Sequence, residues 1–218
     1  MNKRGYRAKA LEAPIRENVA QALIKFSDWD LKKPLIDPMC GSGTILIEAA
    51  LLVKNPLRLN EKLLGESYIF SLLYDNIRKL DKTPSKLPVL LGYDIDPEAI
   101  ELSKENAKKA GVGDLIKFEV RDILELSNDH NFESGYIITN PPYGVRLGDK
   151  ESLKEFYSKL SKRLRSEFPG FRFTLISGDK SLLGNLKLKE DKSKNITIAK
   201  MKGKFANYTF RSLESNEQ

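Results

Sequence analysis

Two hydrogen-bond acceptors and an aromatic ring stand together at Asn140-Pro141-Pro142-Tyr143. A planar conjugated amine is a poor nucleophile because its lone pair is delocalised. If two acceptors bind its two N–H groups, the lone pair can be aimed at an incoming carbon atom, and the Asn140 oxygen and the Pro141 carbonyl are the expected acceptors. The two prolines stiffen the loop, and Tyr143 offers a face on which a base can stack. These four residues are the predicted catalytic residues for methyl transfer to a planar amine.

Polar side chains follow four segments that are predicted to be buried strands. Asp37, Asp94, Asp122 and Asn140 each stand where such a segment ends. Ligands of open α/β sheets bind outside the carboxyl ends of the strands, near the point where the strand order reverses. We therefore expect these four side chains to share one ligand site.

The loop after the first predicted strand carries two glycines, in Asp37-Pro38-Met39-Cys40-Gly41-Ser42-Gly43-Thr44. Glycines between a strand and a helix let a ligand approach the backbone, and the helix N-terminus offers free N–H groups. The loop lacks the Gly-Lys-Ser/Thr of a nucleoside-triphosphate loop and the third glycine of the dinucleotide fingerprint. It therefore favours a different ligand.

A second ligand segment is Asp94-Ile95-Asp96-Pro97. A carboxylate at a strand edge can accept two hydrogen bonds from a ribose diol, which is the role expected of Asp94. Asp96 is better suited to cap the helix that Pro97 begins. Ile95 is expected to lie against an adenine ring, and Asp122 to accept a hydrogen bond from the adenine amino group. Together with Asn140, these residues predict an adenosine-containing cofactor.

Predicted strands and helices alternate along the chain, which is typical of a parallel sheet covered on both faces. We expect residues 1–30 to be an N-terminal segment and a helix that lead into a catalytic domain at 31–218, with a helical insertion around 57–88. The expected fold class is α/β and Rossmann-like, with a mostly parallel seven-stranded sheet and an antiparallel C-terminal strand. Strands are predicted at 35–36, 89–93, 116–120, 136–139 and 171–177, with a closing pair in the tail, and helices at 14–26, 44–54, 97–110 and 153–168.

Composition and charge narrow the class of protein and the kind of partner that it can bind. The 218 residues contain one cysteine and one histidine, so we expect neither a disulfide framework nor a metal site. No apolar run approaches the roughly 20 residues of a membrane span, and a cytoplasmic, monomeric enzyme is expected. The net charge is +7, and residues 150–218 hold 16 basic and 8 acidic side chains. A basic C-terminal region suits a polyanion such as RNA, although a solvated lysine-rich surface would have the same composition.

With these residues in view, the chain resembles the class I S-adenosylmethionine methyltransferases, and in particular the catalytic domain of the THUMP-associated RNA guanine-N2 methyltransferases. The resemblance runs through nearly the whole chain. Its motifs are Lys3-Arg4-Gly5-Tyr6-Arg7, Ala13-Pro14-Ile15-Arg16-Glu17-Asn18, the Asp37–Thr44 loop, Asp94-Ile95-Asp96-Pro97 and Thr139-Asn140-Pro141-Pro142-Tyr143-Gly144-Val145-Arg146-Leu147-Gly148.

The resemblance implies S-adenosylmethionine as cofactor and the exocyclic N2 amine of a guanine as target, in 23S ribosomal RNA first and transfer RNA next. It also implies that Pro14 flanks the methionine end of the cofactor, that the backbone of Met39, Gly41 and Gly43 cradles it, and that Asp37 lies near its amino group. The family usually carries an N-terminal THUMP domain, which we expect to be absent from this sequence. The basic tail would then supply the RNA affinity.

Three other hypotheses share part of this pattern. An N6-adenine methyltransferase of DNA or RNA has the same Asn-Pro-Pro-Tyr loop, and a protein-glutamine methyltransferase also holds a planar amide. A non-catalytic RNA-binding module would share the basic tail, but it would have no need to keep both the glycine loop and the Asn-Pro-Pro-Tyr loop. The Asp37–Thr44 loop and the Arg4-Gly5-Tyr6-Arg7 segment favour guanine in RNA.

Overall fold

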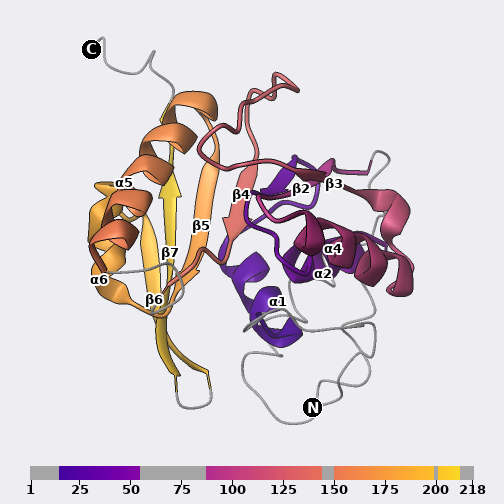
Figure 1. The fold of residues 1–218 in the computed structure, drawn as a ribbon, viewed down its shortest axis with the longest axis horizontal. Helices are drawn as coiled ribbons and strands as arrows, with labels where there is room; N and C mark the ends of the chain where they lie inside the picture. The colour runs from indigo at the N-terminus through magenta and orange to yellow at the C-terminus, as the bar shows by residue number, and fades with distance from the viewer. Residues whose placement is uncertain (1–14, 55–86, 144–149, 199–200, 212–218) are drawn as a thin grey trace.

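The computed structural model describes residues 15–54, 87–143, 150–198 and 201–211, whose helices flank a seven-stranded sheet (Figure 1). In chain order the elements are α1 (Glu17–Phe26), β1 (Leu35–Asp37), α2 (Thr44–Lys54), β2 (Leu90–Asp94), α4 (Pro97–Lys109), the 3-10 helix η2 (Gly113–Leu115), β3 (Ile116–Val120), β4 (Tyr136–Thr139), α5 (Lys150–Glu167), β5 (Arg172–Ser177), α6 (Lys180–Leu183), the 3-10 helix η4 (Gly184–Leu186), β6 (Lys192–Ile198) and β7 (Met201–Thr209).

The strand order across the sheet is β3-β2-β1-β4-β5-β7-β6. β1 pairs in parallel with β2 on one side and with β4 on the other, so the order reverses at β1. β7 lies antiparallel between β5 and β6. This arrangement confirms the predicted Rossmann-like α/β fold with an antiparallel C-terminal strand. It also places the ligand edge expected of such sheets at the carboxyl ends of β1, β2 and β4.

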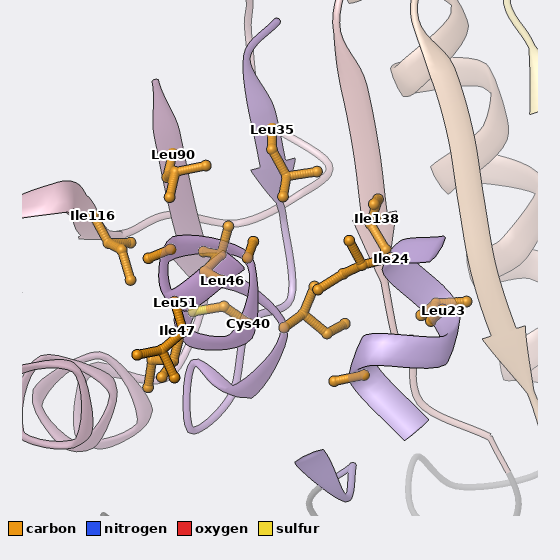
Figure 2. Close-up of a cluster of buried hydrophobic side chains, with 14 of the residues drawn as sticks. Leu23, Ile24, Leu35, Cys40, Leu46, Ile47, Leu51, Leu90, Ile116 and Ile138 are labelled. Atoms are coloured by element: carbon orange, nitrogen blue, oxygen red, sulfur yellow. The ribbon is translucent and has the colours of Figure 1, made fainter. Parts of the chain in front are cut away.

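Two buried clusters cover the two faces of the sheet, because neighbouring residues of a strand point to opposite faces. In β1, Leu35 joins the cluster under α1, α2 and α4, whereas Ile36 joins the cluster under α5 and α6. Figure 2 shows the first cluster, in which residues of α1 and α2 pack against strand residues such as Leu35, Leu90 and Ile138. The central strands are therefore apolar on both sides, which is why they could be predicted as short buried runs.

Most predicted elements agree with the observed ones to within two residues. The helix expected from Pro14 begins only at Glu17, because Arg16 has an extended backbone (φ −73°, ψ 148°). Pro14 itself and most of the expected insertion at 57–88 lie outside the described residues. The short helical segment 180–186 was not predicted, and Leu182, Leu183 and Leu186 bury it against α5 and the sheet.

Candidate active site

The four strand-end residues are brought together by the strand order. Asp37 and Asp94 are the last residues of the neighbouring strands β1 and β2, and Asn140 directly follows β4 on the other side of β1. Asp122 lies two residues beyond β3, next to β2. The four side chains therefore line one edge of the sheet across the reversal point, as the sequence predicted. Their roles toward a ligand stay predictions.

Asp94 fixes the glycine loop directly. Its Oδ2 accepts a hydrogen bond of 2.8 Å from the Gly41 amide, and its Oδ1 accepts one of 3.1 Å from the Asp96 amide. A carboxylate has about four lone-pair sites, so acceptor capacity remains for a ligand diol. Asp94 is half-buried at the strand edge, which is the position expected of a residue that binds ribose. The bond to Gly41 adds a structural role that the sequence did not suggest.

The two glycines of the loop are required for different reasons. Gly41 (φ +52°) and Gly43 (φ +77°) both have a left-handed backbone conformation, which is unfavourable for residues that carry a side chain. A Cβ on Gly41 would meet no atom within 4 Å, so the loop is open on that side. A Cβ on Gly43 would lie 3.0 Å from Ser103 Cβ and 3.1 Å from Phe118 Cζ. Gly41 thus offers the open approach expected for a ligand, and Gly43 is also required by helix–sheet packing.

Asp37 is buried, with an exposed fraction of 1%, at the end of β1. Its Oδ1 accepts hydrogen bonds from Thr139 Oγ1 at 2.8 Å and from the Met39 amide at 3.3 Å. Burial raises the pKa of Asp37 from 3.8 to about 7, although both hydrogen bonds act in the opposite direction. A buried carboxyl that titrates near neutrality favours a cationic partner. This environment suits the amino group that the resemblance places beside Asp37.

Of the remaining residues at this edge, some stabilise the fold and others are accessible to a ligand. Asp96 caps α4, since its side chain accepts from the Glu98 amide at 2.9 Å, and this confirms its predicted role as a helix cap. Ile95 is 66% exposed although apolar, which leaves its side chain accessible to a flat ligand. Asp122 Oδ1 accepts from the Leu124 amide at 2.8 Å. Burial raises the pKa of the Cys40 thiol well above its usual range, so this thiol stays protonated.

Asn140 has the most informative environment. Within the described part of the chain, only Asn140 Oδ1 and Thr174 Oγ1 are buried side-chain polar atoms without a hydrogen-bond partner. A buried acceptor left unpaired costs about 1–3 kcal/mol. The simplest explanation for this unpaired acceptor is a hydrogen-bond donor on a ligand that binds there. Thr174 lies in the middle of β5, whereas Asn140 lies at the ligand edge of the sheet. Asn140 therefore presents an acceptor where the predicted amine would bind.

Two contacts that the sequence did not reveal hold the site segments in place. The Tyr157 hydroxyl of α5 donates to the Pro142 carbonyl at 3.2 Å. Arg163, six residues further along α5, donates to the carbonyls of Leu126 and Glu125 at 2.8 and 2.9 Å, in the segment that follows Asp122. Both residues lie far along the chain from the segments that they bind, so no local pattern could indicate them.

The part of the chain that the structure describes contains no cluster of three or more His, Cys, Asp or Glu side chains that could hold a metal ion. None of its helices is long and apolar enough to cross a membrane. The expectations of a metal-free, cytoplasmic and monomeric enzyme stay predictions, as do the roles of Pro14 and of the expected insertion.

Residues 4–207 match the RMKL-like methyltransferase domain. The chain belongs to this family. Among curated relatives, the "Ribosomal RNA large subunit methyltransferase K/L" of Aliivibrio fischeri (strain MJ11) is 38% identical over 205 residues, which cover 88% of this chain and 29% of that protein. The chain thus spans about a third of the length of the curated relatives that it matches. Membership in the family agrees with the observed fold.

Two solved structures extend the comparison. The crystal structure of SMU.472, which is complexed with SAH, has a TM-score of 0.76 and 27% identity and covers 97% of this chain and 56% of its own. A structure from Listeria monocytogenes, described as a predicted N6-adenine-specific DNA methylase, has a TM-score of 0.71 and 30% identity and covers 94% of this chain and 54% of its own. Both are similar over nearly all of this methyltransferase domain.

Proposed function

We propose that this chain transfers the methyl group of S-adenosylmethionine to the exocyclic N2 amine of a guanine in large-subunit ribosomal RNA. The observation that carries the proposal is the buried, unpaired Asn140 Oδ1 at the ligand edge of the sheet. An acceptor of this kind fits an amine N–H, and the Asp37 and Asp94 carboxylates line the same edge. The name of the Aliivibrio relative supports ribosomal RNA as the substrate, and the resemblance noted in the sequence supports guanine N2.

The residues present fit the cofactor. The glycine loop is open at Gly41, Asp94 retains acceptor capacity for a ribose diol, and Ile95 is exposed beside it. Asp37 provides a buried carboxylate for the amino group of the methionine end. When bound, S-adenosylmethionine supplies a methyl group on a positively charged sulfur. SAH in the SMU.472 structure, with its similar fold, supports this choice.

The chain's own residues then act on the base. Asn140 Oδ1 and the Pro141 carbonyl each accept one N–H of the amine, so that its lone pair faces the methyl carbon. Tyr143 stacks on the base after it leaves its own stack in the RNA. With the methyl group supplied by the sulfonium, the amine nitrogen would gain a bond to carbon and the positive charge that the sulfur loses, and it would then release a proton to water. The positively charged methylated amine is a strong acid, so no strong general base is required.

Methylation of ribosomal RNA in vitro with labelled S-adenosylmethionine, followed by nucleoside analysis, tests the proposal. N2-methylguanosine is the expected product. The second candidate is N6-adenine methylation, which the description of the Listeria structure favours and which would use the same acceptors. If the product were N6-methyladenosine in RNA or DNA, the target base would be adenine and not guanine. Parallel reactions with DNA and with protein complete the test. Labelled protein would point to a glutamine amide, and the absence of labelled product in all three reactions would contradict all three candidates.

A further inference from the structure

The Asn-Pro-Pro-Tyr loop is held by α5 on one side. Tyr157 is fully buried in α5, and its hydroxyl donates to the Pro142 carbonyl at 3.2 Å. Burial raises the pKa of Tyr157 well above its ordinary value, so the hydroxyl remains a donor throughout the working pH range. The bond restrains the peptide group between Pro142 and Tyr143, because a carbonyl that is fixed in direction fixes the plane of its peptide.

The end of β5 also contacts the loop. Gly178 directly follows β5, and a Cβ on it would lie 2.6 Å from Tyr143 Cε2 and 2.8 Å from Cδ2. Real Cβ atoms do not approach so closely, so a side chain at position 178 would push the Tyr143 ring or the backbone aside. The Tyr143 ring therefore lies against bare backbone. The backbone of Gly178 is not left-handed, so what requires glycine here is the neighbouring ring.

We infer that Tyr157 and Gly178 are positioning residues that orient Pro142 and Tyr143 before the target base arrives. The inference rests on the proposed function, since the purpose of the arrangement is to present the Tyr143 face and the adjoining acceptors to a base. Neither residue touches the reacting atoms. A loop that is already held in the reactive geometry loses less conformational entropy when the base binds.

The rate of methyl transfer in a single turnover, at saturating S-adenosylmethionine, tests the Gly178 half by a double-mutant cycle. Gly178→Ala should lower the rate by about tenfold to a hundredfold, as misplacement by about 1 Å does, while the Kd of the cofactor stays unchanged. In a Tyr143→Ala background the same substitution should cost less than about twofold, because the displaced ring is gone. An equal loss in both backgrounds would show that Gly178 does not act through Tyr143.

Matched variants separate positioning from folding. Gly184→Ala adds a Cβ that meets no atom within 4 Å, and it should keep the wild-type rate. Tyr157→Phe should lower the rate about tenfold with an unchanged cofactor Kd. Tyr136→Phe removes the hydroxyl of another buried tyrosine, at the first residue of β4 and so at the other end of that strand from Asn140, and it should keep the rate even if stability falls. If Tyr157→Phe and Tyr136→Phe lose the same rate, Tyr157 is not a positioning residue.

A spectroscopic measurement keeps the inference independent of the identity of the target base. In protein with labelled tyrosine rings, the Tyr143 resonance is assigned from its loss in Tyr143→Phe. Gly178→Ala and Tyr157→Phe should each shift or broaden it, and Gly184→Ala should not. An unmoved Tyr143 resonance in Gly178→Ala overturns the inference even if guanine is methylated. A shifted resonance supports it even if nucleoside analysis names another base or no product.

Discussion

Asn140 Oδ1 is buried at the ligand edge and has no hydrogen-bond partner in the protein. Its removal should therefore affect catalysis much more than stability. We predict that Asn140→Ala lowers kcat by about 10²–10³-fold, as the loss of a catalytic hydrogen-bonding group does. Its free energy of unfolding should stay within about 1 kcal/mol of wild type, because no protein hydrogen bond is broken. Methylation kinetics and urea titration on the same preparations measure the two effects.

The matched control for Asn140 is Thr174, whose Oγ1 is the other buried unpaired atom of the described residues. Thr174→Val replaces a buried hydroxyl in the middle of β5 by a methyl group of nearly the same volume and should leave kcat unchanged. If Thr174→Val lost as much activity as Asn140→Ala, the unpaired oxygen of Asn140 would no longer mark a catalytic acceptor. Retention of full activity by Asn140→Ala would refute the proposed role outright.

Asp37 makes stability depend on pH in a definite direction. Its pKa is about 7 in the folded chain against an ordinary value of 3.8. Between these values the folded chain keeps a proton that the unfolded chain has released, so stability falls as pH rises from about 4 to about 7 and then levels off. The loss attributable to this group is up to about 4 kcal/mol. Urea titration without cofactor should show the fall between about pH 4 and about pH 7 and little further change up to about pH 8.

The Asp37→Asn variant isolates this contribution. An amide does not ionise, so the variant should lose most of the decline in stability and be the more stable protein at pH 8. Its affinity for S-adenosylmethionine should fall, because the buried negative charge expected to face the amino group is missing. The same decline in Asp37→Asn as in wild type would assign the pH dependence to other groups.

At the scale of elements, the close approach of α2 to the sheet depends on one glycine of β2. A Cβ on Gly92 would lie 2.5 Å from Phe118 Cδ1 and 2.7 Å from Leu46 Cδ1. We predict that Gly92→Ala lowers the free energy of unfolding by about 1–3 kcal/mol, the usual range for overpacking. It should also weaken cofactor binding, because β2 carries Asp94 and α2 follows the glycine loop. Gly184→Ala, measured alongside by urea titration and calorimetry, should change neither quantity.

The sequence predicted the elements well because the central strands are short apolar runs that end in polar residues, as at Asp37 and Asp94. It also predicted that the polar residues at these strand ends lie along one edge of the sheet, since parallel strands end at the same edge. It could not predict Tyr157, Arg163 or Gly178, whose roles depend on contacts between segments far apart in the chain. The helical segment 180–186 was missed because its α-helical part, α6, has four residues, which are too few to show a helical period.

At the scale of the molecule, charge is distributed unevenly along the chain. Residues 150–218 carry twice as many basic as acidic side chains, and some of the lysines form ion pairs, as Lys204 does with Glu190 at 2.7 Å and Lys192 with Asp28. Lys187, Lys194 and Lys202 are exposed on η4, β6 and β7 or at their ends. Exposed lysines of this kind attract phosphates without reading a sequence.

We therefore predict that the Kd for RNA rises steeply with salt, whereas the Kd for S-adenosylmethionine hardly changes. Each phosphate contact contributes a slope of about 0.7–0.9 to log Kd against log salt. Replacing Lys187, Lys194 and Lys202 by Gln should reduce the slope for RNA by up to about 2–3 and leave the cofactor Kd unchanged. The control replaces three exposed lysines of α4 by Gln, Lys104, Lys108 and Lys109, and so removes the same charge; two of them pair with glutamates along the helix. It should keep the slope. If the control lowers the slope as much as the test variant, net charge alone brings RNA to the chain, and the strands β6 and β7 have no special part in it.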